Sequence, residues 1–244
     1  MVLHLLSITI IFLPNPSQWF YSEPYEMPRA PGRPREFDKD QALDTALRMF
    51  WRHGYEGTSI SALAAAVGVT VPSLYLAFGN KESLFMQAVE HYGRYSAKLY
   101  EDAFRQKSAR DIARGILLGE VDLVAGEDTP DGCLMVQSAL ATSPESEAVR
   151  QAMAKLRIEA EAEVAERFEH AAREGDLPMG WSAGALACYV MTIAAGMAVQ
   201  AKSGVSREDL LQVAEMAMLI WPDRNNNPRP QNLASRRTRK RRTA

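Results

Sequence analysis

The sequence predicts an all-α protein, with a small N-terminal unit of short helices followed by a larger unit of longer ones. Apolar residues recur at helical spacing along most of the chain, as in the series Leu43, Ala46, Leu47 and Phe50. Glycine, proline and serine separate the periodic stretches. No stretch shows the convincing alternation of apolar and polar residues that is typical of a half-buried strand.

Composition and charge limit the kinds of partner that the chain can have. The 244 residues suffice for one large domain or two small ones, and 47% hydrophobic with 24% charged residues can build an ordinary core. The net charge is −2, but six of the 28 Lys and Arg residues lie in the last nine positions, which leaves 22 basic against 30 acidic residues elsewhere. Any contact between this body and a nucleic acid must therefore be local.

Signatures of enzymes and of metal sites are absent from the sequence. Cys133 and Cys188 lie 55 residues apart, and the four histidines approach neither them nor one another at metal-ligand spacing. There is no phosphate-binding loop, dinucleotide-binding glycine pattern or serine-nucleophile motif. We therefore expect no catalytic residues, no metal and no cofactor, and the few cysteines fit a reducing cytoplasm.

The two ends of the chain differ in composition from the rest. The apolar run at residues 2–13 is too short for a bilayer span and lacks the basic residues and cleavage site of a signal peptide. At Met27 the composition becomes rich in Pro and Arg, so we expect Met27 to be the native start. Residues 1–31 would then be an extension and irregular arm. The alternative is that the apolar N-terminal segment is a membrane-associated leader. Residues 223–244 are predicted to be a disordered basic tail, either solvated or adding nonspecific affinity for nucleic acid.

A second apolar segment, residues 183–199, contains no charge in 17 residues. It is shorter than the roughly 20 apolar residues that a membrane span requires, and it is rich in Ala and Gly rather than Leu and Ile. We therefore predict a buried packing helix. Small residues recur four positions apart and allow another helix to approach closely, as in the pairs Ala183 and Ala187, Gly184 and Cys188, Ala194 and Ala198.

Capping residues and glycines mark the helix boundaries of the N-terminal unit. Gly54 stops the first helix, and Thr58 is the predicted N-cap of the second. A tight turn through Gly68 and a short third helix then complete a helix-turn-helix pattern. Ala64 and Gly68 lie four positions apart, where we expect two helices to touch closely. Asn80 is expected to cap a fourth helix.

The short third helix begins near Thr70 and is predicted to end at Gly79. Leu74 and Phe78, four positions apart, are predicted to face the other helices. The remaining positions point outward and carry no charge, which suits contact with a partner surface. These outward positions are Val71, Pro72, Ser73, Tyr75, Leu76 and Ala77.

Residues 32–92 resemble the TetR family of bacterial one-component transcriptional regulators. The matching segments are FWRHGYEGTSISALAAAVGV, PSLYLAF and GNKESLF, in which Tyr75, Phe78 and Lys81 keep the spacing of the family. The resemblance implies a DNA-binding domain over residues 32–92, with its helix-turn-helix at about residues 59–78. It also implies that residues 93–222 form a domain for ligand binding and dimerisation.

The family pattern implies a homodimer whose third helices enter successive major grooves of DNA. Thr58 and Tyr75 would contact phosphates, and Lys81 would contribute its charge at the start of the fourth helix. Arg33 and Arg35 either reach the DNA or only solubilise the arm. The residues that would face base edges are Val71, Pro72, Ser73, Leu76 and Ala77.

The chain departs from many relatives at residues 76 and 77, which there often carry His, Tyr or Asn and here are Leu and Ala. The outward face therefore lacks Arg, Asn and Gln for bidentate base contacts. Direct readout would rest on Ser73, Thr70 and apolar contact with thymine methyl groups, and DNA shape would carry much of the specificity. Trp51 and His53 are interpreted as packing and capping residues.

Beyond residue 100 we predict helices at residues 108–125, 133–142, 144–174, 181–203 and 206–220. The resemblance implies that the last two form a four-helix bundle with the same pair from a second chain, and the small-residue spacing agrees with this. In relatives, the preceding helices enclose a ligand pocket. Candidate lining residues, each of which also fits an ordinary core, are Met135, Met153, Phe168, Tyr189 and Met191.

Cys133 is a candidate redox residue, because some relatives with a cysteine in this loop region sense oxidants or electrophiles. The surrounding loop, which contains Glu127, Asp128 and Asp131, argues against this role. It lacks the positive charge that would lower the pKa of the thiol.

The sequence thus predicts a DNA-binding transcriptional regulator in the cytoplasm, associated with the nucleoid and not with a membrane. We expect a repressor that binds a palindromic DNA operator as a homodimer and is released by a small-molecule effector. The alternative is an architectural or low-specificity DNA-binding protein. A helical enzyme or a membrane-associated protein is disfavoured by the missing motifs and the short apolar run.

Overall fold

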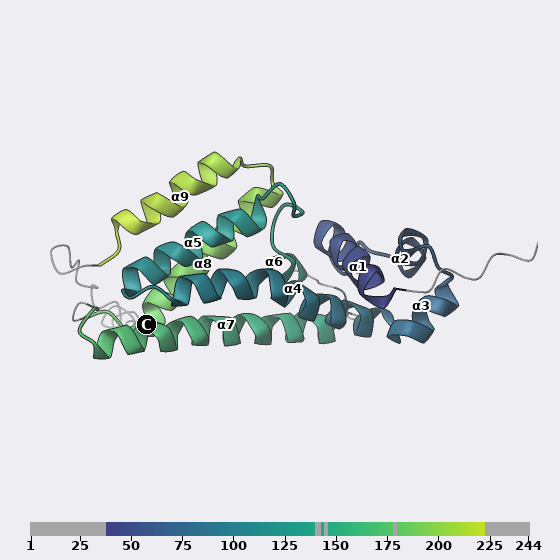
Figure 1. The fold of residues 1–244 in the computed structure, drawn as a ribbon, viewed down its shortest axis with the longest axis horizontal. Coiled ribbons are helices and arrows are strands. Elements are labelled where there is room, and N and C mark those ends of the chain that lie inside the picture. The colour runs from purple at the N-terminus through teal and green to yellow at the C-terminus, as the bar shows by residue number, and fades with distance from the viewer. Residues whose placement is uncertain (1–37, 140–142, 144–145, 178–179, 223–244) are drawn as a thin grey trace, which may run out of the picture. The chain divides into compact units, whose positions relative to one another are not determined.

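The computed structural model describes residues 38–139, 143, 146–177 and 180–222, and the regular elements within these ranges are all helices (Figure 1). The all-α prediction is therefore confirmed. Met27, Arg33, Arg35 and the basic tail lie outside the described residues. The helices are α1 (Lys39–His53), α2 (Ile60–Val67), α3 (Val71–Phe78), α4 (Lys81–Phe104), α5 (Ala109–Val124), α6 (Leu134–Ser138), α7 (Glu147–Arg173), α8 (Ala183–Lys202) and α9 (Arg207–Leu219).

Helices α1, α2, α3 and the first turns of α4 share one small core, which we call the head. Phe50 of α1 meets Phe85 of α4 edge to face, with 5.1 Å between ring centroids, and Leu63 of α2 is fully buried beside them. Leu74 and Phe78 of α3 are 1% and 3% exposed, so their predicted inward orientation is confirmed. Helices α2 and α3 meet at 92°, the angle of a helix-turn-helix.

The N-cap of α2 is one residue away from the predicted position. Ser59 Oγ accepts a hydrogen bond from the amide of Ala62 at 3.1 Å, and Ser59 is the cap. Thr58 instead turns inward and donates its hydroxyl to the carbonyl of Gly54 at 2.8 Å. The prediction of Thr58 as the cap was wrong because both Thr58 and Ser59 have capping side chains. The side chain of Thr58 is buried in the core of the head, so Ser59 is left to cap the helix. The other caps of the head are Asp38, Thr70 and Asn80.

Gly68 ends α2 as predicted, but not for the predicted reason. We expected Ala64 and Gly68 to allow a close approach of two helices. Gly68 has a φ of +80° in the left-handed region, and a Cβ added there would meet nothing within 4 Å. The glycine is needed for its backbone conformation at the end of the helix and not for space.

The connection between α6 and α7 differs from the sequence-based expectation. Helix α6 ends at Ser138, four residues before the predicted end, and α7 begins at Glu147, three residues after the predicted start. The hydroxyls of Ser143 and Ser146 lie 2.9 Å apart, and Ser146 also donates to Glu56 Oε1 at 2.8 Å. Serine side chains that bond locally in this way compete with helix formation. The predicted bounds of α5, α8 and α9 agree with the structure to within two residues.

Helix α4 connects the head with the rest of the protein and runs without a break through residue 92, the predicted domain boundary. Its first turns pack against α1 and α3, and its later turns pack against α5. The contact with α5 is close, because a Cβ added to Gly119 would lie 2.6 Å from Leu99 Cγ. Glycine at this position allows α4 and α5 to approach each other.

Helix α8 is the single helix in the described ranges that is long and apolar enough to cross a membrane. It packs against α5, α7 and α9, and Leu186, Val190 and Met197 are buried in the core. These contacts fit the predicted packing helix. The small residues of α8 lie on two faces of the helix. The residues of the first face are buried within the chain and are Ala183, Ala187, Ala194 and Ala198. The other is exposed and consists of Gly184, Cys188 and Gly196.

Candidate nucleic-acid interface and adjoining pocket

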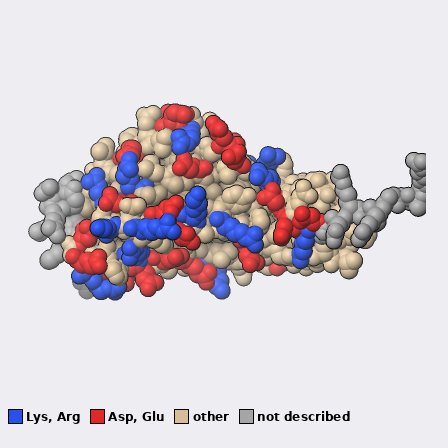
Figure 2. Space-filling model, in the orientation of Figure 1, with Lys and Arg blue, Asp and Glu red and all other residues tan. Residues whose placement is uncertain are grey.

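The outer face of α3 is apolar, exposed and uncharged. Leu76 is 91% exposed and Tyr75 is 45% exposed, although both are large apolar side chains. Pro72 and Ser73 are also exposed, and Val71 and Ala77 are half-buried. Residues Val71–Phe78 of α3 include no acidic or basic residue, whereas Figure 2 shows side chains of both signs interleaved over the rest of the described surface. An isolated exposed leucine is ordinary, but a whole uncharged helix face indicates a contact surface.

The polar groups of this face lie at the start of α3. Thr70 is the N-cap, and its Oγ1 accepts a hydrogen bond from the amide of Ser73 at 3.3 Å. The two hydroxyls lie 2.9 Å apart and bond to each other. Thr70 and Ser73 therefore form one unit at the N-terminus of the helix, where the helix dipole favours an anionic partner.

Lys81 begins α4, directly after the cap that follows α3. Its Nζ lies 4.3 Å from the centroid of the Tyr55 ring, a cation-π contact that fixes the position of the charge. The side chain is half-buried, and burial lowers its pKa, while the nearby Glu56 acts in the opposite direction. Lys81 is thus a positioned cation at the edge of the head.

Thr58 is not placed as the sequence predicted for a phosphate contact. It is 1% exposed, and its hydroxyl is bonded inside the head. The neighbouring Ser59 and Ser61 are exposed, with 3.0 Å between their hydroxyl oxygens, and present the polar atoms that we had assigned to Thr58. The sequence contained this signal, because three hydroxyl residues occur within four positions.

Trp51 is 1% exposed and packs as predicted, and His53 is exposed in the last turn of α1.

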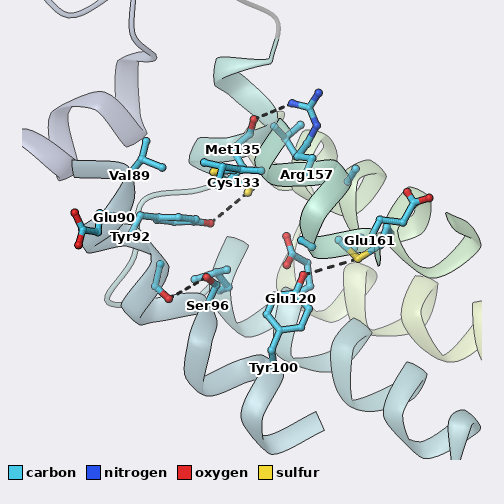
Figure 3. Close-up of a pocket in the computed structure, with 18 of the residues that line it drawn as sticks. Val89, Glu90, Tyr92, Ser96, Tyr100, Glu120, Cys133, Met135, Arg157 and Glu161 are labelled. Atoms are coloured by element: carbon cyan, nitrogen blue, oxygen red, sulfur yellow. Dashed lines mark hydrogen bonds between the residues drawn. The ribbon is translucent and has the colours of Figure 1, made fainter. Parts of the chain in front are cut away.

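A cavity of about 920 Å³ adjoins the head, within the size range of ligand sites. Its wall is formed by α4, α5, α7, α8, α6 and the residue that precedes α6 (Figure 3). Met135, Met191 and Cys133 line it, as do residues of α4 that the sequence analysis did not select. Among these, Tyr92 and Tyr100 contribute their hydroxyl groups.

Three candidate lining residues do not line this cavity. Met153 is fully buried on α7. Phe168 packs edge to face on Trp221, with 5.6 Å between the ring centroids. Tyr189 donates its hydroxyl to the carbonyl of Ala217 at 2.9 Å, which joins α8 to α9. Helical periodicity alone does not tell which buried residues of a long helix meet a cavity and which meet another helix.

The buried polar groups of the cavity were missed by the sequence analysis. Glu120 lies on the apolar face of α5 and is 8% exposed. Burial raises the pKa of its carboxyl group to about 7. A signal existed in the sequence, because Glu120 stands between Leu117 and Val121 in the buried stripe of an amphipathic helix.

The Cys133 thiol is buried in the cavity wall. Tyr92 donates its hydroxyl hydrogen to Cys133 Sγ at 3.2 Å. Burial, and to a smaller extent the charge of Glu120, raise the pKa of the thiol to about 11. A thiol with this pKa is protonated near neutral pH, which argues further against a reactive thiolate.

Comparison with known proteins identifies the family. Residues 42–88 match the bacterial regulatory proteins of the tetR family. The HTH-type transcriptional repressor ComR of Escherichia coli (strain K12) is 32% identical over 194 residues, which is 79% of this chain and 92% of ComR. The chain belongs to the TetR family of bacterial transcriptional regulators.

Solved structures of TetR regulators have the same fold. One of them is a cysteine variant of the TetR family transcriptional regulator CifR, solved in complex with 26-base-pair double-stranded operator DNA. It is 41% identical to this chain, with a TM-score of 0.74, and the match covers 78% of this chain and 100% of the CifR chain. AibR, in complex with isovaleryl coenzyme A and operator DNA, shares the fold at 22% identity and a TM-score of 0.58, over 76% of this chain and 98% of its own. The TetR family consists of regulators and not enzymes, as the sequence predicted.

Proposed function

We propose that this TetR-family chain is a repressor that binds a palindromic DNA operator as a homodimer, in the cytoplasm, and that a small molecule in the cavity releases it. The uncharged, exposed outer face of α3 is the observation that carries this proposal. The similarity to ComR, a transcriptional repressor, and to CifR, solved with operator DNA, supports extending both properties to this chain.

Recognition of DNA would use apolar and shape-dependent contacts. Leu76 and Val71 fit the methyl groups of thymine, and Ser73 at the start of α3 offers a hydroxyl group to a base edge. Tyr75 and Lys81 lie at the borders of this face and fit backbone phosphates. Because the face has no side chain for bidentate base contacts, DNA shape would account for much of the specificity.

Dimerisation would use the exposed faces of α8 and α9. Met216 is 65% exposed, Leu219 is 74% exposed and Ile220 is 62% exposed, and Val213 continues this apolar strip along α9. The exposed small residues of α8 allow close approach of a partner helix. Burying these side chains in a second copy would remove an apolar area that a monomer would leave in water.

Release would act through two connections between the cavity and the head. Helix α4 contributes Tyr92 and Tyr100 to the cavity, and Lys81 begins the same helix. The segment before α6 contributes Cys133 to the cavity and binds α1 through the preceding residue, Gly132. A ligand that fits one arrangement of these elements better than another would shift the spacing of the two heads.

In vitro selection of bound DNA at stated salt, combined with analytical ultracentrifugation, tests this function. We expect one enriched palindrome and a dimer at micromolar concentration. A chain that stays monomeric would contradict the dimer. Uniform binding of all sequences would favour the architectural alternative, in which the same heads bind DNA with low specificity.

A further inference from the structure

Glu120 is a buried carboxyl group without a partner. It lies in the wall of the cavity, and in the described part of the chain no group donates a hydrogen bond to it. Burial is the one cause that shifts its pKa, so no neighbouring cation compensates its charge. Buried polar groups are nearly always hydrogen-bonded, because leaving one unpaired is costly. Glu120 is therefore placed for a partner from outside the chain.

The nearest hydroxyl groups bond elsewhere. Tyr100 donates its hydroxyl hydrogen to Met191 Sδ at 3.8 Å, and Tyr92 donates to Cys133 Sγ at 3.2 Å. Figure 3 shows the carboxyl group of Glu120 beside Tyr100, between these two tyrosine–sulfur pairs. Both hydroxyl groups thus bond to sulfur, a weak acceptor. The acceptor positions of the Glu120 carboxyl group remain available to a ligand in the cavity.

The charges around the cavity favour a cation. The charged residues that line it are Glu90, Glu120, Glu161 and Arg157. Figure 3 shows the carboxyl group of Glu120 among the other drawn side chains and those of Glu90 and Glu161 turned away from it. Arg157 donates to the carbonyl of Met135 at 3.3 Å and does not affect the pKa of Glu120. A carboxylate or phosphate ligand would be repelled by the Glu120 carboxylate, whereas a cation would be attracted to it.

We propose that this cavity binds an amphipathic cation, an apolar molecule whose protonated amine pairs with the carboxylate of Glu120. This inference rests on the proposed function, because the ligand would be the effector. The apolar part of the ligand would contact Met135, Met191 and Leu156, which line the cavity with flexible apolar side chains. A charge-assisted bond inside an apolar cavity is stronger than the same bond in water.

The pairing makes ligand affinity depend on pH in a defined direction. Tyr92 and Tyr100 of α4 and the Cys133 thiol face Glu120, and each is neutral near pH 7 because burial raises its pKa. Glu161 and Arg157 come from α7, and the lining residues of α8 carry no charge. Glu120, with its pKa at about 7, is thus the group that titrates. Since the amine needs the carboxylate, its affinity should rise about tenfold from pH 6 to pH 8.

Three probes with the same phenyl group and chain length but different charge test the proposal. We would titrate the full chain with 4-phenylbutylamine, 4-phenylbutanol and 4-phenylbutyrate by isothermal calorimetry at pH 6 and pH 8. We expect the amine to bind at least about tenfold more tightly than the alcohol at pH 8 and the carboxylate to bind most weakly. The affinity of the alcohol should change little or fall between pH 6 and pH 8, because the alcohol also fits the protonated carboxyl.

Glu120→Gln is expected to remove both the preference for the amine and its pH dependence. The matched control is Glu166→Gln, which changes an exposed carboxylate of α7 outside the cavity and should leave both unchanged. Equal binding of the amine and the alcohol by the wild-type chain, or preference for the carboxylate, would overturn the proposal even if Glu120→Gln did not fold. DNA binding is measured separately, so a chain that binds an operator but not the amine preferentially refutes only this inference.

Discussion

Trp51 Nε1 donates a hydrogen bond of 2.6 Å to the carbonyl oxygen of Gly132, and both residues are buried. Trp51 belongs to α1 of the head, and Gly132 precedes Cys133 in the cavity wall. The amide of Gly132 in turn donates to the carbonyl of Val124 at the end of α5, at 2.8 Å. One residue thus connects the DNA-binding head, the wall of the cavity and α5.

Replacing Trp51 with Phe should weaken this connection. The substitution leaves the carbonyl of Gly132 buried without its donor, which costs about 1–3 kcal/mol of unfolding free energy. Urea denaturation at pH 7 measures the loss. Trp221→Phe is the control, because Trp221 is also buried and packs on an aromatic ring, Phe168. Equal losses for the two variants would show that the hydrogen bond contributes nothing beyond ring volume.

Gly132 itself should not tolerate a side chain. Its φ is +86°, and a Cβ would lie 3.0 Å from Gln137 Nε2, 3.1 Å from Lys202 Cβ and 3.2 Å from the carbonyl oxygen of Ala198. Gly132→Ala combines backbone strain with crowding, and we expect it to cost about 2–4 kcal/mol of unfolding free energy.

Gly68→Ala is the matched control for Gly132→Ala. Gly68 has nearly the same φ, +80°, but a Cβ there meets nothing within 4 Å. The strain of the left-handed conformation alone costs about 1–2 kcal/mol. Thermal or urea unfolding of both variants separates the two effects, and an equal cost would contradict the predicted crowding around Gly132.

Glu120 predicts a decrease of stability as pH rises. Burial raises the pKa of its carboxyl group from 4.5 to about 7, so between these values the folded chain holds a proton that the unfolded chain has lost. Its contribution to stability is complete below pH 4.5 and is lost as pH rises through about 7, by about 3 kcal/mol in total. Urea denaturation at pH 5 and pH 8 should show this decrease in the wild-type chain.

Glu120→Gln provides the comparison for the pH profile. Glutamine has the same shape but does not ionise, so the decrease between pH 5 and pH 8 should be smaller by about 2 kcal/mol than in the wild type, since part of the total loss falls outside this range. Parallel profiles for the two proteins would mean that the Glu120 carboxyl group titrates as it does in an unfolded chain.

Lys81 should contribute to DNA binding without selecting sequence. We expect Lys81→Gln to weaken binding to selected and scrambled DNA by a similar factor and to reduce the salt slope by about one per protomer. Filter binding between 50 and 200 mM salt measures the slope. Lys98→Gln, an exposed lysine later on α4, is the control and should leave the slope unchanged. An unchanged slope for a folded Lys81→Gln protein would exclude its phosphate contact.

The fold was predictable from the sequence because its signals are local. Apolar spacing, the glycines at positions 54, 68 and 79, and the cap at Asn80 each depend on a few neighbouring residues. The orientation of Leu74 and Phe78 followed from their spacing on a short helix. The same reasoning misplaced the cap at Thr58, since Thr58 and Ser59 are both good caps and the choice between them depends on packing in the head.

The cavity was less predictable because it depends on contacts between distant segments. Met135 and Met191 lie in its wall, whereas Phe168 and Tyr189 pack on residues near the end of α9. Glu120 was overlooked because one acidic residue in an apolar stripe has no motif. Its lack of a partner becomes evident only when α4, α5, α7 and α8 are assembled.

We propose that the outer face of α3 reads DNA, and the affinity of Leu76→Ala for the selected operator is the sharpest test of this role. Ile158→Ala is the control, because Ile158 is 70% exposed on α7, away from the head. We predict that Leu76→Ala binds the selected operator about tenfold more weakly than the wild type, with unchanged melting temperature and unchanged affinity for scrambled DNA, whereas Ile158→Ala binds normally. Wild-type operator affinity in Leu76→Ala, or an equal loss in Ile158→Ala, would contradict the claim.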